Sequence, residues 1–372
     1  KTLIDMGNAF VCDCKTEVFR ELIQKKKACP CRSLSTEDQE ERWHKMFTKY
    51  NEGEAVLRIK TDVKNPNPAI RDWPACRISD AKHPKQGKKY RVWPLMNFSV
   101  AVDDHDNELT HIIRGKDHIV NMERQKYIYK FFDWWIPSYV HIGRVNFKDL
   151  KISTSGFRKA IEEKKYTGWD DPRLPTLRAF KKRGLKPEAF MKYVEELGPS
   201  KVDKTVSYKE FMQSIYSFNR SLIEKEADRY AFVEKAKKIT IKDAPTMTVK
   251  APLHPEVSSR GYRSIKTSNQ FYIEDTLKQN KHYRLMHLFN FKNNQFVSAE
   301  LDKSLQASLI HWLPVADNLI KVKVHMPDGK VLKGLGDANL KKVRIDRIIQ
   351  FERKFFARLD KKEKEEGTCF TY

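Results

Sequence analysis

The spacing of apolar residues changes along the chain and predicts its first elements. Over residues 16–28 and 36–50, apolar side chains recur every three or four positions, which indicates two amphipathic helices. The second is expected to be capped by Thr36, because acidic residues fill its first turn. Residues 54–63 alternate between apolar and polar, which predicts a strand.

A second group of patterns predicts an α/β region. Residues 94–106 form an apolar run that ends in acids, which is typical of a buried strand. Residues 110–134 predict a strand, an Arg-Gly turn and a helix capped by Asp117, and residues 138–147 form a third apolar segment. This order of elements predicts half of a nucleotide-binding sheet.

Helical periodicity takes over after residue 151 and is then replaced by alternation. Pro187 and Gly198 delimit one predicted helix, and residues 209–233 predict one or two more. Beyond residue 236 the period falls to two, with a hairpin around a Pro-Asp-Gly-Lys turn near residue 328 and a last strand over 350–362. We therefore expect an α/β region, an all-α region and an all-β region.

Composition indicates a globular protein with a polyanionic partner. The 372 residues allow two to four domains, and 40% are hydrophobic. The formal net charge of +23 is spread along the chain, which favours a nucleic-acid partner over the alternative of a lysine-rich proteome. The sequence contains no run of eighteen apolar residues and no signal-peptide pattern, so we expect a cytoplasmic protein with no membrane partner.

Four of the six cysteines fall within twenty residues as two C-x-C pairs. Four thiolates in two close pairs match the ligand set of tetrahedral zinc, and four ordinary thiols are the alternative. The remaining two cysteines stand alone and are expected in the core or at the surface. The candidate zinc ligands are Cys12, Cys14, Cys29 and Cys31, and the isolated residues are Cys76 and Cys369.

Two short motifs resemble signatures of class I aminoacyl-tRNA synthetases. His141-Ile-Gly-Arg144 differs by one residue from the HIGH tetrapeptide that binds ATP, and Lys151-Ile-Ser-Thr-Ser155 resembles KMSKS. In that class the two signatures are far apart in sequence, whereas here they are nearly adjacent. We therefore interpret the first motif as a coincidental match and the second as the signature loop.

Longer segments carry a more specific resemblance, which covers essentially the whole chain. The chain resembles the archaeal-type glutamyl-tRNA synthetases of the glutamyl/glutaminyl group, and Gly168-Trp-Asp-Asp-Pro-Arg-Leu-Pro-Thr-Leu177 is especially specific for that group. The family carries HIGH in an N-terminal half, so the resemblance implies that this half is absent and lies upstream of Lys1. The matching segments are residues 58–78, 97–105, 111–125, 168–184 and 219–233.

The resemblance implies a multidomain fold: the second half of a Rossmann-type catalytic fold with an acceptor-stem insertion, a helical stem-contact domain and anticodon-binding β-barrels. The implied domains are 1–90 for the rest of the insertion with a zinc knob, 91–150 for the catalytic half-fold, 151–235 for the signature loop and helical domain, and 236–372 for the barrels.

It also implies roles for individual residues. Arg114 matches the position that binds the glutamate side chain, and a guanidinium suits a carboxylate. Its structural alternative is an ion pair with Asp103 or Asp104. The family's neighbouring tyrosine is Met96 here. Three residues at the following helix start are candidates for ATP or substrate contacts, or alternatively for capping and packing: Asp117, His118 and Asn121.

The signature loop and the helical domain provide the remaining candidates. The loop residues would stabilise the leaving pyrophosphate, although Thr154 replaces the second lysine of KMSKS. Asp170 and Asp171 are expected to hold two arginines against the tRNA stem. The candidate catalytic residues are Lys151, Ser153 and Ser155, and the candidate tRNA-binding residues are Arg173 and Arg178.

The implied function is ligation of glutamate to tRNA, with ATP as a substrate, Mg²⁺ and a structural Zn²⁺. The expected partners are glutamate and tRNA-Glu, with tRNA-Gln as an additional candidate, and the expected state is a monomer. Two alternatives stay open: a glutaminyl-tRNA synthetase, and a tRNA-binding chain without chemistry.

Overall fold

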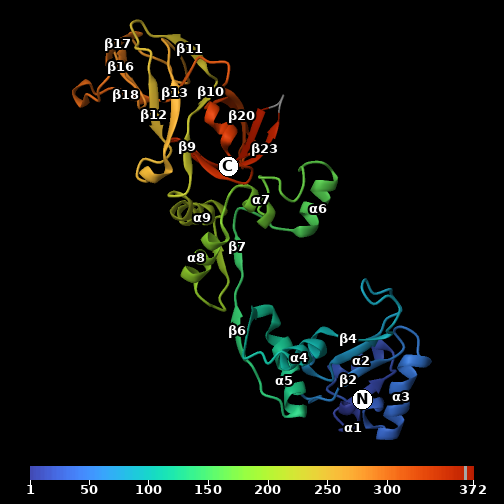
Figure 1. Ribbon diagram of the computed structural model, residues 1–372. Coiled ribbons are helices and arrows are strands. Elements are labelled where there is room, and N and C mark those ends of the chain that lie inside the picture. The colour runs from blue at the N-terminus through green and yellow to red at the C-terminus, as the bar shows by residue number, and fades with distance from the viewer. Residues whose placement is uncertain (364–366) are drawn as a thin grey trace. The chain divides into compact units, whose positions relative to one another are not determined.

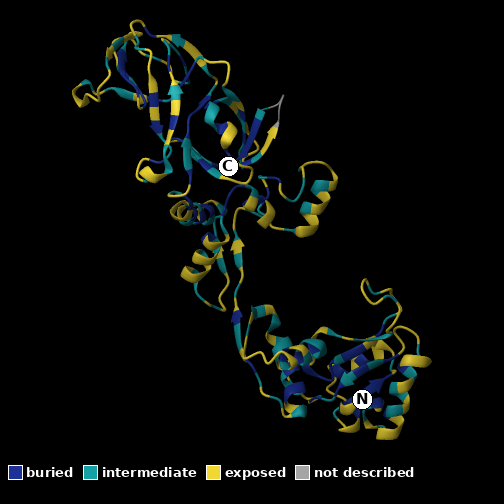
Figure 2. Ribbon diagram, viewed as in Figure 1, coloured by how far each residue is buried: buried dark blue, intermediate teal, exposed yellow. Residues whose placement is uncertain are grey.

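The computed structural model describes residues 1–363 and 367–372, and the chain forms two compact units (Figure 1). Unit 1 comprises residues 1–146 and 199–205, and unit 2 comprises residues 147–198 and 206–372. Figure 2 shows the buried residues gathered inside each unit, with exposed residues on the helices and loops around them. No helix in the described part of the chain is long and apolar enough to cross a membrane.

Unit 1 is built on an antiparallel sheet in the order β1-β2-β3-β4. The large side chains of Trp73 and Tyr129 are fully buried in its core. Both helices predicted before residue 50 are present, but the cap of the second is Ser35, whose hydroxyl accepts from the Asp38 amide, and not Thr36. The elements are α1 Thr2–Asp5, β1 Ala9–Cys12, α2 Thr16–Gln24, η1 Pro30–Ser33, α3 Thr36–Thr48, β2 Val56–Ile59, η2 Pro68–Ile70, β3 Pro74–Ile78 and β4 Val92–Pro94.

The apolar run at residues 94–106 is a helix, α4 (Met96–Asp106), so the prediction of a buried strand there was wrong. Its buried residues Asn97, Ala101 and Asp104 recur at helical spacing. This face packs on α5 and β3. A short apolar run does not distinguish a strand from a buried helix, and tertiary packing decided the outcome here.

The segment that follows forms one βαβ unit. Strands β5 (His111–Gly115) and β6 (Ser138–Ile142) are parallel, and α5 (Ile119–Phe132) connects them after the short η3 (Lys116–His118). This parallel pair agrees with a nucleotide-type fold. The predicted half-sheet is smaller than expected, because the segment predicted as its first strand forms helix α4.

Unit 2 begins with short helices and continues as strands. Helix α9 has a capping box formed by Ser207 and Glu210 and ends at Ile223, so the prediction of helix up to residue 233 was wrong at its end. Two short strands, β7 (Val145–Phe147) and β8 (Lys204–Val206), pair where the chain passes between the units. The helices are α6 Thr154–Glu162, α7 Leu177–Lys182, α8 Pro187–Leu197 and α9 Tyr208–Ile223.

The rest of unit 2 is β-rich, as its alternating pattern predicted, although it starts at residue 228 and not 236. The largest sheet has the order β10-β21-β20-β24-β23-β22-β9, and it contains the predicted hairpin β20–β21. The strands are β9 Asp228–Tyr230, β10 Phe232–Glu234, β11 Lys237–Thr240, β12 Thr248–Pro252, β13 Tyr262–Lys266, β14 Gln270–Ile273, β15 His282–Leu285, β16 Asn290–Lys292, β17 Gln295–Ser298, β18 Ser308–Ile310, β19 Trp312–Pro314, β20 Ile320–His325, β21 Val331–Gly336, β22 Ile348–Phe351, β23 Phe355–Glu363 and β24 Gly367–Thr371; short 3-10 turns are η4 Ser258–Arg260, η5 Lys303–Leu305 and η6 Ala338–Lys342.

Candidate functional site

Arg114 lies near the end of β5, and the parallel pairing with β6 places His141 beside it. Its Nη2 donates to Gln125 Oε1 at 2.7 Å, and its guanidinium carbon lies 4.9 Å from the centre of the Tyr139 ring. None of the ion pairs in the described residues joins Arg114 to Asp103 or Asp104. The arginine is therefore held by a neutral amide and an aromatic face, and the nearby Asp104 interacts with its charge without forming an ion pair in the described residues.

Three polar nitrogens around this arginine are buried and have no hydrogen-bond partner within the described residues: Arg114 Nε, Gln125 Nε2 and His141 Nε2. The first two are donors in every protonation state. Burial, followed by the charge of Arg114, lowers the pKa of His141. Unpaired buried donors are costly, and a carboxylate ligand would satisfy them.

The other residues predicted near this site lie at the start of α5, but their contacts are local. Asp117 forms an ion pair with Arg144 and does not cap the helix, so the predicted cap was wrong. Asn121 Nδ2 lies 2.9 Å from His118 Nδ1. Met96, at the position of the family's tyrosine, begins α4 and is 49% exposed.

The structure places the 141–144 motif on β6 and in the turn after it. His141 is 3% exposed and belongs to a strand, whereas the HIGH signature opens a helix. Gly143 lies tightly against another backbone segment, because a Cβ there would come 2.3 Å from the Val202 carbonyl oxygen. Its glycine is thus explained by packing, in agreement with the interpretation of this motif as a coincidental match.

The signature-loop residues lie in unit 2 and lead into α6. Ser153 caps this helix: its hydroxyl accepts from the Gly156 amide at 3.2 Å and lies 3.2 Å from the Ser155 hydroxyl. Lys151 is exposed. The backbone amides of a helix N-terminus, together with hydroxyls and a lysine, form an arrangement that suits phosphate.

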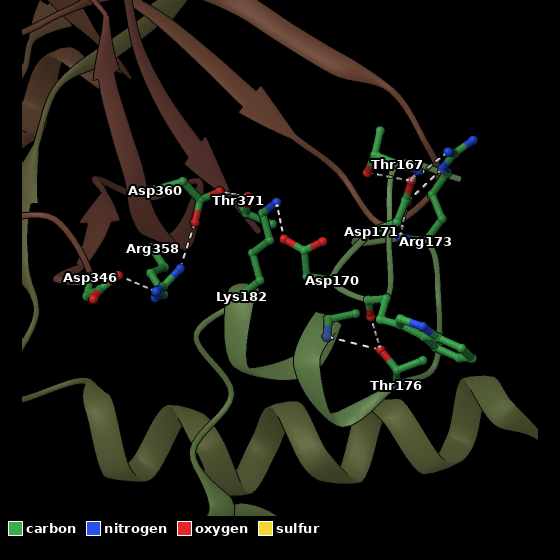
Figure 3. A network of polar contacts seen from close by, with 12 residues as sticks. Thr167, Asp170, Asp171, Arg173, Thr176, Lys182, Asp346, Arg358, Asp360 and Thr371 are labelled. Atoms are coloured by element: carbon green, nitrogen blue, oxygen red, sulfur yellow. Dashed lines mark hydrogen bonds and ion pairs between the residues drawn. The ribbon is translucent and has the colours of Figure 1, made fainter. Parts of the chain in front are cut away.

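A pocket of about 820 Å³ lies in unit 2 between the 167–182 segment and strands β20, β23 and β24. Figure 3 shows its polar network. Asp171 is buried and accepts from Arg173 Nε at 2.8 Å and from Arg173 Nη2 at 2.7 Å. Burial opposes ionisation of Asp171, but these bonds and those from Thr167 hold its pKa well below the usual range. The prediction that Asp171 holds Arg173 is confirmed.

Asp170 has a different partner from the predicted one. Its carboxylate pairs with Lys182 at 2.9 Å, visible at the centre of Figure 3, and not with Arg178. Arg178 is exposed, lines the same pocket, and takes part in none of the ion pairs found in residues 1–363 and 367–372. The pocket also contains Lys181 and Lys330. Its lining is strongly cationic, as a phosphate-binding surface would be.

The four clustered cysteines converge as the sequence predicted. Their sulfur atoms all lie within 4.8 Å of one another, with Cys12–Cys29 at 3.7 Å and Cys14–Cys31 at 3.5 Å. Four sulfurs bound tetrahedrally at about 2.3 Å from zinc would be about 3.8 Å apart, so the separations fit. The two isolated cysteines, Cys76 and Cys369, are both buried in the core.

Neighbouring side chains hold this cluster in place. Asp13 Oδ1 accepts from Cys31 Sγ at 3.2 Å and from Arg42 Nη1 at 2.7 Å. The buried Gln39 of α3 donates to the Cys31 carbonyl and accepts from the Val11 amide at 2.7 Å. Gln39 thus ties the Cys31 backbone to β1, whereas the Cys31–Asp13 hydrogen bond is one that only the protonated thiol can donate.

Sequence reasoning missed Gln125 and Tyr139 as neighbours of Arg114. They are 11 and 25 residues away along the chain, and only the βαβ pairing brings them together. Its helical spacing from the buried Ile128 and Tyr129 of α5 was the one available signal for Gln125.

Comparison with known families and proteins identifies the family of the chain from its sequence. Residues 1–225 match the model of the class I tRNA synthetase catalytic domain for E and Q, and residues 227–310 match the corresponding anti-codon binding domain. The chain is 44% identical to the glutamate–tRNA ligase of Methanocaldococcus jannaschii, over 99% of this chain and 68% of that protein. It is 42% identical to the one of Methanothermobacter thermautotrophicus, over 96% of this chain and 65% of that protein.

The chain thus spans about two thirds of the length of these relatives. The matches do not locate the remaining third, so the expectation that an N-terminal half is absent is unsupported. A solved glutamate tRNA ligase from Elizabethkingia meningosepticum has a TM-score of 0.36 at 16% identity, covering 61% of this chain and 52% of that one. Because that likeness is weak, the family assignment rests on sequence.

Proposed function

The chain belongs to the glutamate–tRNA ligases, in the class I group of synthetases for E and Q, and on that premise we propose that Arg114 binds the side-chain carboxylate of glutamate. The observation that carries this proposal is the set of buried donors without partners at Arg114 and Gln125. A glutamate carboxylate would accept from both, forming charge-assisted hydrogen bonds in a partly dry site. Glutamine offers one neutral acceptor oxygen in place of two charged ones, so its NH2 group would face one of these donors.

The signature loop acts on ATP. Lys151 and Ser155, with the amides at the start of α6, would stabilise the negative charge that develops on pyrophosphate as the α-carboxylate of glutamate attacks the α-phosphate. Ser153 has a positioning role, because its hydroxyl caps the helix. Mg²⁺ supplies further charge neutralisation when bound with ATP. With Thr154 in place of the second lysine, Lys151 carries more of this task.

Of the residues near Arg114, His118 and Asn121 are proposed to contact ATP or the substrate ammonium group. Asp117 is proposed to act indirectly, since its carboxylate is engaged by Arg144. Burial raises the pKa of the nearby Asp104, and the positive charge of Arg114 opposes part of this rise.

For tRNA, the proposed contacts lie in unit 2. Arg178 would bind the phosphate backbone directly, and Arg173 would shape the pocket through Asp171. The β-rich region, proposed to form β-barrels, would read the anticodon. The proposed domain limits are 1–90, 91–150, 151–235 and 236–372. The monomeric state and the charging of tRNA-Gln stay predictions.

The cysteine cluster is proposed to hold structural zinc. Four protein thiolates close the coordination shell and leave no position for a reacting water, so the ion would stabilise the knob between β1 and α3 and take no part in the chemistry. Without a cation, burial raises the pKa of the Cys14 thiol to about 12.

The decisive experiment is ATP–pyrophosphate exchange in the presence of tRNA, with glutamate and glutamine compared as substrates. Exchange with glutamate, and at least about 10²-fold less with glutamine, is expected because a mismatched buried polar group costs several kcal/mol. A preference for glutamine would refute the role assigned to Arg114. Exchange with neither amino acid, while tRNA still binds, would indicate a chain without the chemistry.

A further inference from the structure

Tyr139 lies on β6, and its ring faces the arginine that is proposed to bind glutamate. The parallel register pairs Tyr139 with Ile112 and Arg114 with His141. Residues two apart on a strand share a face, so Tyr139 and Arg114 are diagonal neighbours on one face of the strand pair. The guanidinium carbon of Arg114 lies 4.9 Å from the centre of the ring. A cation over an aromatic face is attracted to it by the negative charge of that face.

The guanidinium of Arg114 is held at two points and left open at a third. Nη2 donates to Gln125 Oε1 at 2.7 Å, and the Tyr139 ring lies against the guanidinium carbon. Nε is buried without a hydrogen-bond partner in the described residues. Bidentate binding of a carboxylate needs the guanidinium within about 0.5 Å and 10–20° of the productive geometry. Since one hydrogen bond leaves the group free to swing about it, the ring supplies the second restraint.

The hydroxyl of Tyr139 is tied into the core by two further side chains. It donates to the Tyr129 hydroxyl at 3.5 Å, and the Tyr129 hydroxyl donates to Asp104 Oδ2, also at 3.5 Å. The three residues come from β6, α5 and α4 (Figure 1). Burial raises the pKa of both tyrosines, so both keep the proton that they donate. The chain of hydroxyls therefore connects the ring beside Arg114 to a buried carboxylate.

The ring contact and the hydroxyl chain do not contribute equally. Both hydroxyl contacts are long, because O–H···O hydrogen bonds usually measure about 2.7–2.8 Å. The hydroxyl of Tyr139 thus guides the ring without fixing it tightly. The direct contact between the ring and the guanidinium carries more of the restraint, and loss of the ring should cost more than loss of the hydroxyl.

Tyr139 also packs against the core of unit 1, and packing alone is the competing explanation. Tyr127 of α5 allows the two to be separated. It is half-buried like Tyr139 and packs against the same core. Within the described residues, its ring contact is with Phe131 and not with Arg114. Replacing Tyr127 therefore removes an equivalent packing contact and leaves the arginine untouched.

We propose that Tyr139 is a positioning residue for glutamate: its ring supports the guanidinium of Arg114, and its hydroxyl is anchored through Tyr129 to Asp104. The inference rests on the proposed role of Arg114 and deepens it by naming the group that orients the arginine. Tyr139 acts through Arg114 and does not take part in the chemistry. Because the side-chain carboxylate is bound alike before and during adenylate formation, the effect of Tyr139 falls on KM for glutamate and not on kcat.

The test measures tRNA-dependent ATP–pyrophosphate exchange by the whole chain, together with glutamate binding by calorimetry. Tyr139→Leu is expected to raise KM for glutamate about 10-fold and to change kcat less than about threefold, since the cation–π contact is lost. Tyr139→Phe keeps the ring and should raise KM only about two- to threefold. Tyr127→Leu is the matched control and should leave both constants nearly unchanged.

Misfolding is distinguished by the constant that changes. A loss of folded chain lowers kcat and leaves KM for glutamate and KM for ATP as they were, whereas a misplaced Arg114 raises KM for glutamate alone. Tyr139→Met fills a similar space without an aromatic face and is expected to repeat the KM effect of Tyr139→Leu. It replaces Tyr139→Leu in the test if that variant does not fold.

A double-mutant cycle shows whether Tyr139 acts through Arg114. Tyr139→Leu is introduced into Arg114→Leu, where the arginine that it would position is already missing. In this background it is expected to lower kcat/KM for glutamate by less than about twofold, because the two residues act as a unit. A further loss of about 10-fold, equal to that in the unaltered chain, would overturn the proposal.

The remaining outcomes separate the two levels of inference. If the unaltered chain neither binds glutamate nor supports exchange, the proposed function fails and the role of Tyr139 fails with it. If Arg114→Leu loses glutamate binding while Tyr139→Leu behaves like Tyr127→Leu, the role of Arg114 stands and that of Tyr139 is overturned. A fall in kcat for Tyr139→Leu with unchanged KM for glutamate would likewise assign this residue to packing.

Discussion

Two arginines, Arg114 in unit 1 and Arg173 in unit 2, have opposite surroundings. Arg173 directs two nitrogens at the buried Asp171, and Arg173 Nη2 also donates to the Lys165 carbonyl at 2.9 Å. Arg114 is bound by one neutral amide and keeps a buried nitrogen without a partner. An arginine whose bonds are filled within the protein stabilises the fold, whereas one left unfilled is available to a ligand. Both were predicted as binding residues, and only their contacts distinguish them.

Replacing Arg114 should produce the largest change. Arg114→Leu is expected to lower kcat/KM for glutamate in ATP–pyrophosphate exchange by about 10²–10³-fold, because removing one partner of a charged pair costs about 2–5 kcal/mol. Arg114→Lys keeps the charge but loses the bidentate geometry, so its kcat/KM should lie between those of Arg114→Leu and the unaltered chain. Lys130→Gln, at an exposed position of α5 in the same unit, serves as the control and should leave exchange nearly unchanged. If Arg114→Leu lowers kcat/KM by less than threefold, the side-chain carboxylate of glutamate binds elsewhere.

Removing the proposed zinc ion tests which cysteines of unit 1 hold it and how far it stabilises that unit. Cys14→Ser/Cys31→Ser should reduce the metal content from about one zinc per chain to almost none and lower the melting temperature of unit 1 by several degrees. Cys76→Ala, which removes a buried thiol outside the cluster, should retain the metal. Elemental analysis with thermal unfolding measures both. Equal zinc content in the two variants would contradict the assigned ligands.

The Asp171–Arg173 pair should reveal its structural role through acid. Asp171→Asn is expected to destabilise unit 2 by about 1–3 kcal/mol at pH 7, since it breaks a charged hydrogen bond within the fold. The pKa of Asp171 is lowered in the folded state, so its stabilisation is complete above the ordinary aspartate value of 3.8 and is lost as pH falls below it.

The difference between Asp171→Asn and the unaltered chain should therefore shrink between pH 5 and pH 2, as measured by urea midpoints. Asp170→Asn is the matched control, because its carboxylate is 54% exposed and its ion pair with Lys182 should contribute little. A constant difference across this range would show that Asp171 acts by packing alone.

The smallest expected effect concerns Arg178, the exposed cation in the same pocket as Arg173. Arg178→Gln should weaken tRNA binding about threefold to tenfold and reduce the log–log salt slope by about 1, with no change in urea midpoint. Arg173→Gln should instead lower the urea midpoint. An unchanged slope in Arg178→Gln would show that no phosphate contacts this residue.

Several elements could be predicted from the sequence because their causes are local. The Pro187 start and Gly198 end of α8, the alternation in β20 and the turn after it, and the approach of the two C-x-C pairs depend on residues close in the chain. The error at α4 arose because a run of apolar residues suits a strand or a buried helix equally well. The partners of Arg114 on α5 and β6 could not be predicted, because no local rule sets which distant side chains fill a buried site.

The sequence by itself therefore determined the order of the α/β, helical and β-rich regions, the net positive charge, the cluster of four cysteines and the family resemblance. Only the tertiary structure decided that Asp171 neutralises Arg173, that Asp170 pairs with Lys182, and that Arg114 keeps unfilled hydrogen-bonding capacity. The physical reason is that helix and strand periodicities depend on neighbouring residues, whereas the pairing and desolvation of a charge depend on which distant groups packing brings within about 3 Å of it.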